Sequence, residues 1–531
     1  MVGHAELNRL LRIFDVFGTG TLRRSELVEV LKRTNGSLFT DANVTRLLDG
    51  FDQDRHASVC IEQFLLWLTQ DYEKGPRKRR DPRRHLVLHF DINKTIVMVD
   101  SVTGKTVADI ANAVLATTSW GTAEERGGAI GKVWRCVVAA PRVRRPAPDL
   151  VSYAEFLEAQ LPGPENKERR EVLLHRFTAP SEPGEAMRRH CDAFLATLKL
   201  PEAVAGTEAA RAAGLQRGEV FIIPAFFQLL LHLKLTSRSF CLVFRTFGED
   251  LEEVAREFNA FCEGRHPLFP EAVLDGRDGD VDYRIAMHEP SAFGTFFRST
   301  VSCDGDALIF GTLRQPKLKD GLDFYQECSA SPGVKVVSGG LEAICGALHS
   351  RTRRPGTLAL RDYFPFWRQQ GMGSDPKKLT GGKLMVVDPC APDSSHEMFF
   401  DDNISYTAPR IVDVRHARLP QKVLSAQYLL SCHVVRAEPL EAVTDHQYFI
   451  KHVDRLTAAY EQRLMVCARL RRLLWKAAST SAFARARALP LSLYAEQYDA
   501  WAGMREDKRC HSTAEIFEEV HPDVQDRAAG A

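Results

Sequence analysis

Several residues that could bind a metal ion or a phosphate group follow apolar, strand-like runs of the sequence. The run "LVLHF" is followed by Asp91, "FCLVF" by Arg245 and then Thr246, and "MFF" by Asp401 and Asp402. Carboxylates bind divalent cations and can attack phosphorus, whereas a hydroxyl or an ammonium group can hold phosphoryl oxygens. These residue types are therefore suited to phosphoryl chemistry.

The elements that must position these residues are the strands of an α/β domain. From residue 85 to about 425, short apolar runs alternate with helical segments, a pattern that predicts a sheet of parallel strands. A fourth run, "LMVV", directly follows Lys383. Ligands of open α/β sheets bind outside the carboxyl ends of the strands, so the polar residues are expected together at one end of the sheet.

The order of these groups resembles the four motifs of the haloacid dehalogenase-like (HAD) superfamily. The family pattern is D-x-D-x-T, a Ser or Thr after a strand, a Lys and an acidic pair, and the resemblance covers residues 85–425. It implies a Rossmann-like parallel sheet with cap insertions and magnesium-dependent hydrolase or phosphotransferase chemistry. Long inserts between the motifs would form the caps. Trp120 and Trp134 are expected to fill the core of the first insert, with the lining of a cap as the alternative.

The resemblance implies three catalytic residues. Asp91 would be the nucleophile, and Thr246 and Lys383 would hold the phosphoryl group. No spacing rule fixes the lysine motif, so Lys383 has rivals elsewhere in the chain, namely Lys317, Lys319, Lys377 and Lys378.

The resemblance also implies a Mg²⁺ site. Its ligands would be Asp91, the backbone carbonyl of Asn93, Asp401 and Asp402. Asn93 departs from the family pattern, in which an aspartate at this position acts as general acid and base. An amide carries no transferable proton near neutral pH, and general acid–base catalysis contributes about 10²–10⁴-fold. Three readings stay open: a leaving group that needs no proton, slow turnover, or phosphate binding without catalysis.

Apolar residues at helical spacing on both sides of two polar loops predict two helix–loop–helix units in residues 1–74. The first loop, "DVFGTGTLRRSE", resembles a calcium-binding EF-hand loop, with Asp15 at position 1, Thr19 at 5, Gly20 at 6 and Glu26 at 12. Phe17 stands where a second acidic ligand is expected. The loop therefore keeps the turn glycine and the last glutamate but lacks ligand charge.

The second loop, "DQDRHASVCIEQ", keeps Asp52 and Asp54 at positions 1 and 3. Ala57 replaces the glycine and Gln63 replaces the bidentate glutamate. The two loops together resemble an EF-hand pair with weakened ligation. Because calcium affinity depends on ligand charge and site rigidity, Ca²⁺ binding is expected to be weak. A structural or docking unit and a calcium sensor are the two readings left open.

Two further segments have a recognisable composition. The stretch "EKGPRKRRDPRR" lacks apolar residues and predicts a linker at residues 75–84. Its basic run 77–84 is expected to be solvated, with a nuclear import signal or a patch that binds an anionic surface as the alternatives. Residues 426–531 are predicted to be mostly helical. Their basic amphipathic segment 463–489 is expected to pack on the α/β domain, with an intramolecular contact to the EF-hand pair as the alternative.

Composition disfavours some classes of partner. The 531 residues carry 70 Lys and Arg against 69 Asp and Glu, so no net field attracts nucleic acid or a membrane. The apolar run 220–235 contains Pro224, Gln228 and His232 and predicts a buried core helix. The 12 cysteines form no C-x-x-C pair and the N-terminus has no apolar signal segment, which predicts an intracellular, cytoplasmic protein with reduced thiols.

The sequence therefore predicts an α/β, HAD-like domain between an all-α EF-hand pair and a helical C-terminal region. The expected function is magnesium-dependent phosphoryl transfer, or binding of a phosphorylated small molecule or phosphoprotein. The alternative is a calcium-responsive regulatory protein whose α/β domain is a non-catalytic scaffold. Whether the chain is an enzyme stays undecided at this point.

Overall fold

The structure is a computed structural model of the chain, and it describes most of residues 84–477. The described residues are 21–23, 28, 58–60, 84–99, 104–125, 132–300, 305–316, 321–373, 381–387, 395–417, 419–424 and 426–477. The predicted calcium ligands and the rival lysines lie outside them: Asp15, Thr19, Glu26, Asp52, Asp54, Lys317, Lys319, Lys377 and Lys378. The predictions made for these residues, and for nearly all of the linker 75–84, stay predictions.

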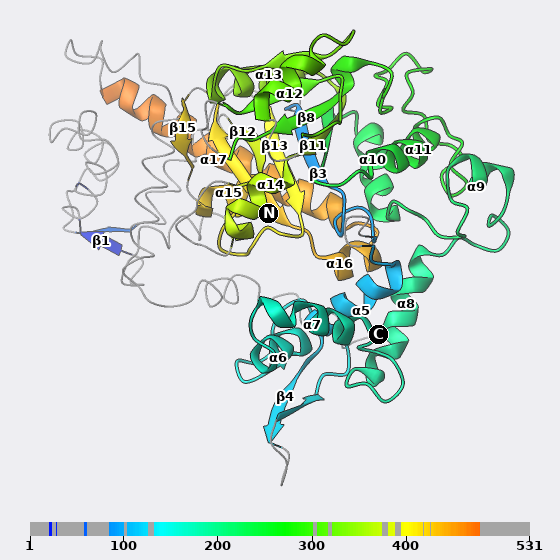
Figure 1. Cartoon of the computed structure of the whole chain (residues 1–531). Helices are drawn as coiled ribbons and strands as arrows, with labels where there is room; N and C mark the ends of the chain where they lie inside the picture. Colours follow the sequence, from blue (N-terminus) through cyan, green and yellow to red (C-terminus); the bar gives the residue numbers. More distant parts are fainter. Residues whose placement is uncertain are drawn as a thin grey trace.

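A mostly parallel sheet of eight strands, the main sheet, lies at the centre of the described chain and confirms the predicted α/β fold (Figure 1). Neighbouring strands are parallel from β8 to β16, and β9 pairs antiparallel with β8 and β10. In spatial order the strands are β10 (Lys335–Val337), β9 (Ala307–Phe310), β8 (Phe293–Phe297), β11 (Gly356–Asp362), β7 (Phe240–Thr246), β3 (Leu86–Asp91), β13 (His396–Asp401) and β16 (Val434–Arg436).

Both faces of the main sheet are buried, which is why its central strands read as continuous apolar runs. In β3, Leu86, Leu88 and Phe90 enter one core cluster, whereas Val87 enters another. Three helices cover the first face, α10 (Pro224–Leu235), α11 (Leu251–Cys262) and α17 (Tyr448–Ala477). The predicted core helix at 220–235 is confirmed as α10, whose apolar side chains are largely buried.

The opposite face carries α13 (Leu341–Thr352) and a three-stranded second sheet. The second sheet consists of β12 (Lys383–Val387), β14 (Val412–His416) and β15 (Leu419–Val423) in that order. The run "LMVV" is therefore part of strand β12, but β12 and β14 do not belong to the main sheet. Their apolar side chains instead pack onto it, with Leu384 and Val386 in the same core cluster as Val87.

Residues 104–125 and 132–200, here called the insert, follow β3 and contain a small antiparallel sheet with helices around it. Figure 1 shows these elements gathered below the main sheet. Trp120 and Trp134 are buried in the insert, where their indole N–H groups donate to the carbonyls of Arg142 and Val151 at 2.7 and 3.0 Å. The elements are α5 (Val107–Thr118), β4 (Trp120–Glu125), β5 (Lys132–Cys136), β6 (Val151–Ser152), α6 (Tyr153–Gln160), α7 (Lys167–His175) and α8 (Arg188–Leu198).

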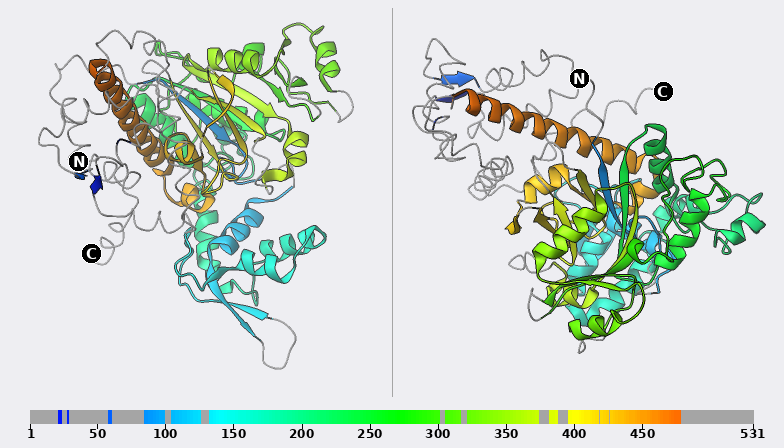
Figure 2. Two further views of the ribbon diagram at one scale, coloured as in Figure 1. Left: turned by 90° about the vertical axis from the view of Figure 1, so that its left-hand side faces the viewer. Right: turned by 90° about the horizontal axis from the view of Figure 1, so that it is seen from above.

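The C-terminal part of the described chain is mostly helical, as predicted, but the main sheet extends past residue 425 because β16 pairs with β13. Figure 2 shows α17 as one long helix that runs along the sheet and then away from it. Within the described residues, no helix combines the length and apolarity that crossing a bilayer requires. The remaining helices are α9 (Glu208–Ala212), α12 (Gly321–Cys328), α14 (Phe364–Gln369), α15 (Ala426–Cys432) and α16 (Pro439–Thr444).

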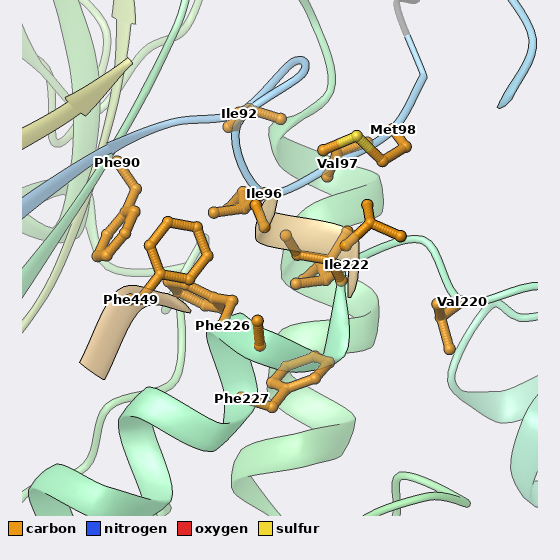
Figure 3. Close-up of a cluster of buried hydrophobic side chains, with 14 of the residues drawn as sticks. Phe90, Ile92, Ile96, Val97, Met98, Val220, Ile222, Phe226, Phe227 and Phe449 are labelled. Carbon is orange, nitrogen blue, oxygen red and sulfur yellow. The ribbon is translucent and has the colours of Figure 1, made fainter. Parts of the chain in front are cut away.

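The chain turns sharply after β3 rather than continuing as a strand. The amides of Ile96 and Val97 both donate to the carbonyl of Ile92, at 3.0 Å each. These three side chains are fully buried, and Figure 3 shows Ile96 above Phe226 and Val97 close to Ile222. The apolar residues beyond Asp91 therefore anchor a turn in the core, which fixes the polar residues between them.

Candidate functional site

Three of the predicted site residues stand at the ends of neighbouring parallel strands. Asp91, Thr246 and Asp401 are the last residues of β3, β7 and β13. Because Phe90 is paired with Phe400 across β3 and β13, Asp91 and Asp401 follow at the same level. The sheet therefore brings the two carboxylates together although 310 positions separate them in the sequence (401 − 91).

Lys383 connects these two carboxylates. Its Nζ donates to Asp401 Oδ2 at 2.7 Å and also contacts Asp91 Oδ1. The lysine is 1% exposed, and its ammonium lies 4.9 Å from the centre of the Phe247 ring. Among the lysines considered from the sequence, Lys383 is the one within the described residues, and it contacts both acids.

Asp402 completes a cluster of three carboxylates, each of which offers an oxygen within 4.8 Å of the others. Thr95 ties this cluster to the turn after β3. Its hydroxyl donates to Asp91 Oδ2 at 3.3 Å and accepts from the backbone amide of Asp402 at 3.2 Å. One threonine thus fixes the distance between the β3 and β13 parts of the cluster.

The electrostatics of the cluster follow from its burial and its excess of negative charge. Burial raises the pKa of Asp91, although Lys383 opposes this effect. Burial also raises the pKa of Asp402 to about 6, although Lys94 lowers it. Burial alone would lower the pKa of Lys383, but its carboxylate neighbours raise that pKa above its usual value, so the ammonium stays charged.

The side-chain amide of Asn93 contacts Asp250. Its Nδ2 donates to Asp250 Oδ2 at 3.0 Å. Asp250 is 2% exposed, and neither its Oδ1 nor the Asn93 Oδ1 has a hydrogen-bond partner within the described residues. Asn93, which stands where the family has an aspartate, therefore contacts the carboxylate of Asp250 from the segment after β7.

Thr246 is buried, and its hydroxyl accepts a hydrogen bond from the backbone amide of Gly248 at 2.8 Å. The hydroxyl keeps its own proton for donation. Its position at the end of β7, next to β3, agrees with the predicted location, whereas its predicted contact with a phosphoryl group stays a prediction.

Three contributors to the site were not predicted from the sequence. Thr95 was visible in the D-x-N-x-T pattern, and its spacing could have suggested the bond to Asp91. Asp250 lies 157 positions from Asn93, and Phe247 lies 136 positions from Lys383 (383 − 247), so no local pattern relates either residue to its partner.

The donor set fits a hard divalent cation such as Mg²⁺. With all three carboxyls ionised, their charges and that of the Lys383 ammonium sum to two negative charges, which a divalent cation would neutralise. Carboxylate oxygens are the ligands that Mg²⁺ and Ca²⁺ prefer, and Mg²⁺ sites commonly use one or two carboxylates with phosphate oxygens. The residues present therefore fit the implied metal.

Comparisons with protein-family models, with curated proteins and with solved structures find no match to this chain.

Proposed function

We propose that this chain binds Mg²⁺ and a phosphorylated ligand at the ends of β3 and β13, in the manner of HAD-like proteins, and that Asp91 can transfer the phosphoryl group. The observation that carries the proposal is the contact of Lys383 with both Asp91 and Asp401, beside the third carboxylate of Asp402. A lysine and three acids converging at adjacent strand ends combine a cation site with an anion-binding donor.

Each residue has a role that its chemistry permits. A carboxylate oxygen of Asp91 would form a bond to phosphorus while the bond from phosphorus to the leaving oxygen breaks. Lys383 would donate to the phosphoryl oxygens, and Thr246 would donate from the neighbouring strand. Bound Mg²⁺ would supply charge neutralisation at the phosphoryl group, held by Asp91, Asp401 and Asp402.

Asn93 restricts the substrate class. Its amide can orient a ligand, but it cannot protonate a leaving oxygen. The reaction would therefore favour an acyl phosphate or another anhydride, whose leaving group departs without a proton. The site would bind alkyl phosphates but hydrolyse them slowly.

Binding linkage tests the proposal without knowledge of the substrate. Mg²⁺ with beryllofluoride should raise the melting temperature, because a ligand at 100 times its Kd stabilises the folded state by about 2.7 kcal/mol. Asp91→Asn and Asp401→Asn should each abolish the rise. Asp278→Asn is the matched control, since this aspartate is paired with Lys234 outside the cluster. A rise that persists in both site variants would refute the proposal.

A screen of phosphorylated metabolites and acyl phosphates with Mg²⁺ would then separate transfer from binding. Phosphoryl transfer predicts faster turnover of acyl than of alkyl phosphates. Binding without transfer predicts thermal stabilisation by phosphorylated ligands and no release of phosphate from any of them.

A second candidate function, calcium response, is favoured by the pairing of two short N-terminal strands. Strands β1 (Thr21–Arg23) and β2 (Ser58–Cys60) are antiparallel, and Leu22 is paired with Val59. Both residues are eighth in their twelve-residue loops, so the pairing supports two loops arranged as a pair. Calcium titration of the full chain tests this function: a micromolar Kd that Glu26→Gln abolishes would support sensing, and binding weaker than about 10⁻⁴ M would refute it.

A further inference from the structure

Lys383 reaches the carboxylate cluster from a strand that does not belong to the main sheet. Within the described residues, β12 pairs only with β14, so one side of β12 has no strand neighbour. On its paired side, the amide of Lys383 donates to the carbonyl of Ile411 at 2.9 Å. The position of Lys383 over Asp91 and Asp401 therefore depends on what attaches β12 to the main sheet.

Arg245 makes one such attachment immediately after Lys383. Its Nη1 donates to the carbonyl of Leu384 at 2.7 Å. The guanidinium is fully buried, and Asp362 at the end of β11 holds it through two hydrogen bonds, one of them 2.9 Å from Nε to Oδ2. A residue of β7 is thus fixed by β11 and bonded to the backbone of β12.

Arg298 makes a second attachment just before Lys383. It follows β8, and its Nη1 donates to the carbonyl of Gly381 at 2.8 Å and to Asp413 Oδ2 at 2.7 Å. Its Nε donates to Asp306 Oδ2 at 3.2 Å. Arg298 therefore joins the end of β8 to β14 and to the backbone two residues before β12.

We propose that Arg245 and Arg298 are positioning residues for Lys383, and that together they clamp β12 so that the ammonium lies between Asp91 and Asp401. The inference that Lys383 acts on a phosphoryl ligand rests on the proposed function, whereas the clamp itself does not. Arginine suits this task because its planar group presents several donors in a fixed geometry and stays charged when buried.

The ordinary alternative is that both arginines are core ion pairs with no effect on the site. Their bonds to the carbonyls of residues 381 and 384 favour the clamp, because these carbonyls lie on either side of Lys383. Losing either bond would release the backbone of β12, and a shift of about an ångström is enough to misplace a reacting group.

Opposite effects on two ligands distinguish the clamp from general destabilisation. The Lys383 ammonium is paired with the carboxylates of Asp91 and Asp401, so it competes with Mg²⁺ for these two ligands. Its positive charge also attracts phosphate. Lys383→Met should therefore tighten binding of Mg²⁺ alone by several-fold and weaken binding of inorganic phosphate in its presence by about tenfold or more. A variant that merely loosens the fold would weaken both.

Two variants test the clamp by calorimetry. Arg298→Gln removes one attachment, and it leaves Asp413 paired with Arg415 and Asp306 bonded to the amide of Ser299 at 2.8 Å. Arg245→Met combined with Asp362→Leu removes the other attachment together with its buried partner charge, because an unpaired buried Asp362 carboxylate would destabilise the fold strongly. Both should reproduce the opposite effects of Lys383→Met. In a Lys383→Met background, Arg298→Gln should have no further effect on either ligand.

Glu257→Gln is the matched control. Glu257 is as buried as the arginines, but its contacts are with His266 at 3.1 Å and the amide of Ile222 at 2.7 Å. The variant should leave both affinities unchanged. Arginine variants that weaken Mg²⁺ and phosphate binding in parallel, or a control that shows the same opposite effects, would overturn the proposal.

A second measurement keeps the clamp testable even if the protein binds neither Mg²⁺ nor phosphate. Acetic anhydride labelling followed by mass spectrometry reports whether Lys383 is accessible, with the exposed Lys451 as internal standard. Lys383 should resist labelling in the natural chain and in Glu257→Gln, and its labelling should rise about tenfold in the arginine variants. Unchanged labelling in both arginine variants would overturn the clamp, whereas absence of ligand binding in the natural chain would overturn only the proposed function.

Discussion

Replacing Asn93 by aspartate would place a second carboxylate against Asp250. The Asn93 Nδ2 atom that would become an oxygen lies 3.0 Å from Asp250 Oδ2. At an effective dielectric constant of about 20, two full charges at this distance repel by roughly 5 kcal/mol. The pair can instead take up one proton, which costs about 4 kcal/mol at pH 7 for a carboxyl of pKa near 4. Asn93→Asp should therefore destabilise the chain by about 2–4 kcal/mol at neutral pH.

The pH dependence of this loss has a definite sign. Repulsion raises the pKa of the new carboxylate pair above the value in the unfolded chain. Between pH 5 and pH 8 the folded variant then binds more protons than the unfolded chain, so its free energy of unfolding falls as pH rises. Urea unfolding at pH 5 and pH 8 measures the free energy of unfolding that Asn93→Asp loses relative to the natural chain. This loss should be larger at pH 8.

The exchanged variant, Asn93→Asp with Asp250→Asn, is the matched control. It restores one amide and one carboxylate with their roles reversed, so most of the lost stability should return at both pH values. It also places an acid two residues after Asp91. Hydrolysis of an alkyl phosphate should rise by about 10²-fold or more, and hydrolysis of an acyl phosphate should rise less. Equal stability of Asn93→Asp and the natural chain at pH 8, or no recovery in the exchanged variant, would refute the reasoning.

Three further predictions concern other parts of the structure. Thr95→Val removes the hydroxyl bonds to Asp91 and to the Asp402 amide, and it should weaken Mg²⁺ binding about tenfold in calorimetry; unchanged affinity would show that the cluster does not need this link. Phe90→Ala should cost about 3–5 kcal/mol in urea unfolding, because the ring is buried and stacks on Phe400 at 4.7 Å; a loss below 1 kcal/mol would contradict the packing. Burial raises the pKa of Cys241 to about 12, so this thiol should react with Ellman's reagent only after unfolding; rapid reaction in the native state would contradict its burial.

The sequence predicted the strand ends that carry Asp91, Thr246 and Asp401 because buried strands leave a strong apolar signal. It did not predict that Lys383 comes from a second sheet. An apolar strand such as "LMVV" has the same pattern whichever sheet it joins, since periodicity records burial and not the identity of the neighbouring strand. For this reason the sequence did not distinguish Lys383 from the other lysines that could fill this motif.

The apolar residues after Asp91 gave a second ambiguity. Ile96, Val97 and Met98 have the apolar composition of a strand, whereas in the structure they fill the core from a compact turn. A short apolar run is compatible with both, and the choice depends on long-range packing against residues such as Ile222. The contact between Asn93 and Asp250 was hidden for the same reason, because it joins segments that are remote in the sequence.

The two sheets meet late in the synthesis of the chain. Helix α17 contributes Phe449, Val453 and Leu456 to the cluster under the main sheet, and Tyr460 and Leu464 to the cluster under the second sheet. At roughly 5–20 residues per second, the ribosome needs on the order of half a minute to travel from Asp91 to Leu464. Throughout most of that interval the carboxylate at the end of β3 has no lysine to neutralise it. Because α17 contributes to both clusters, the packing that holds the two sheets together is complete only after α17 has left the ribosome.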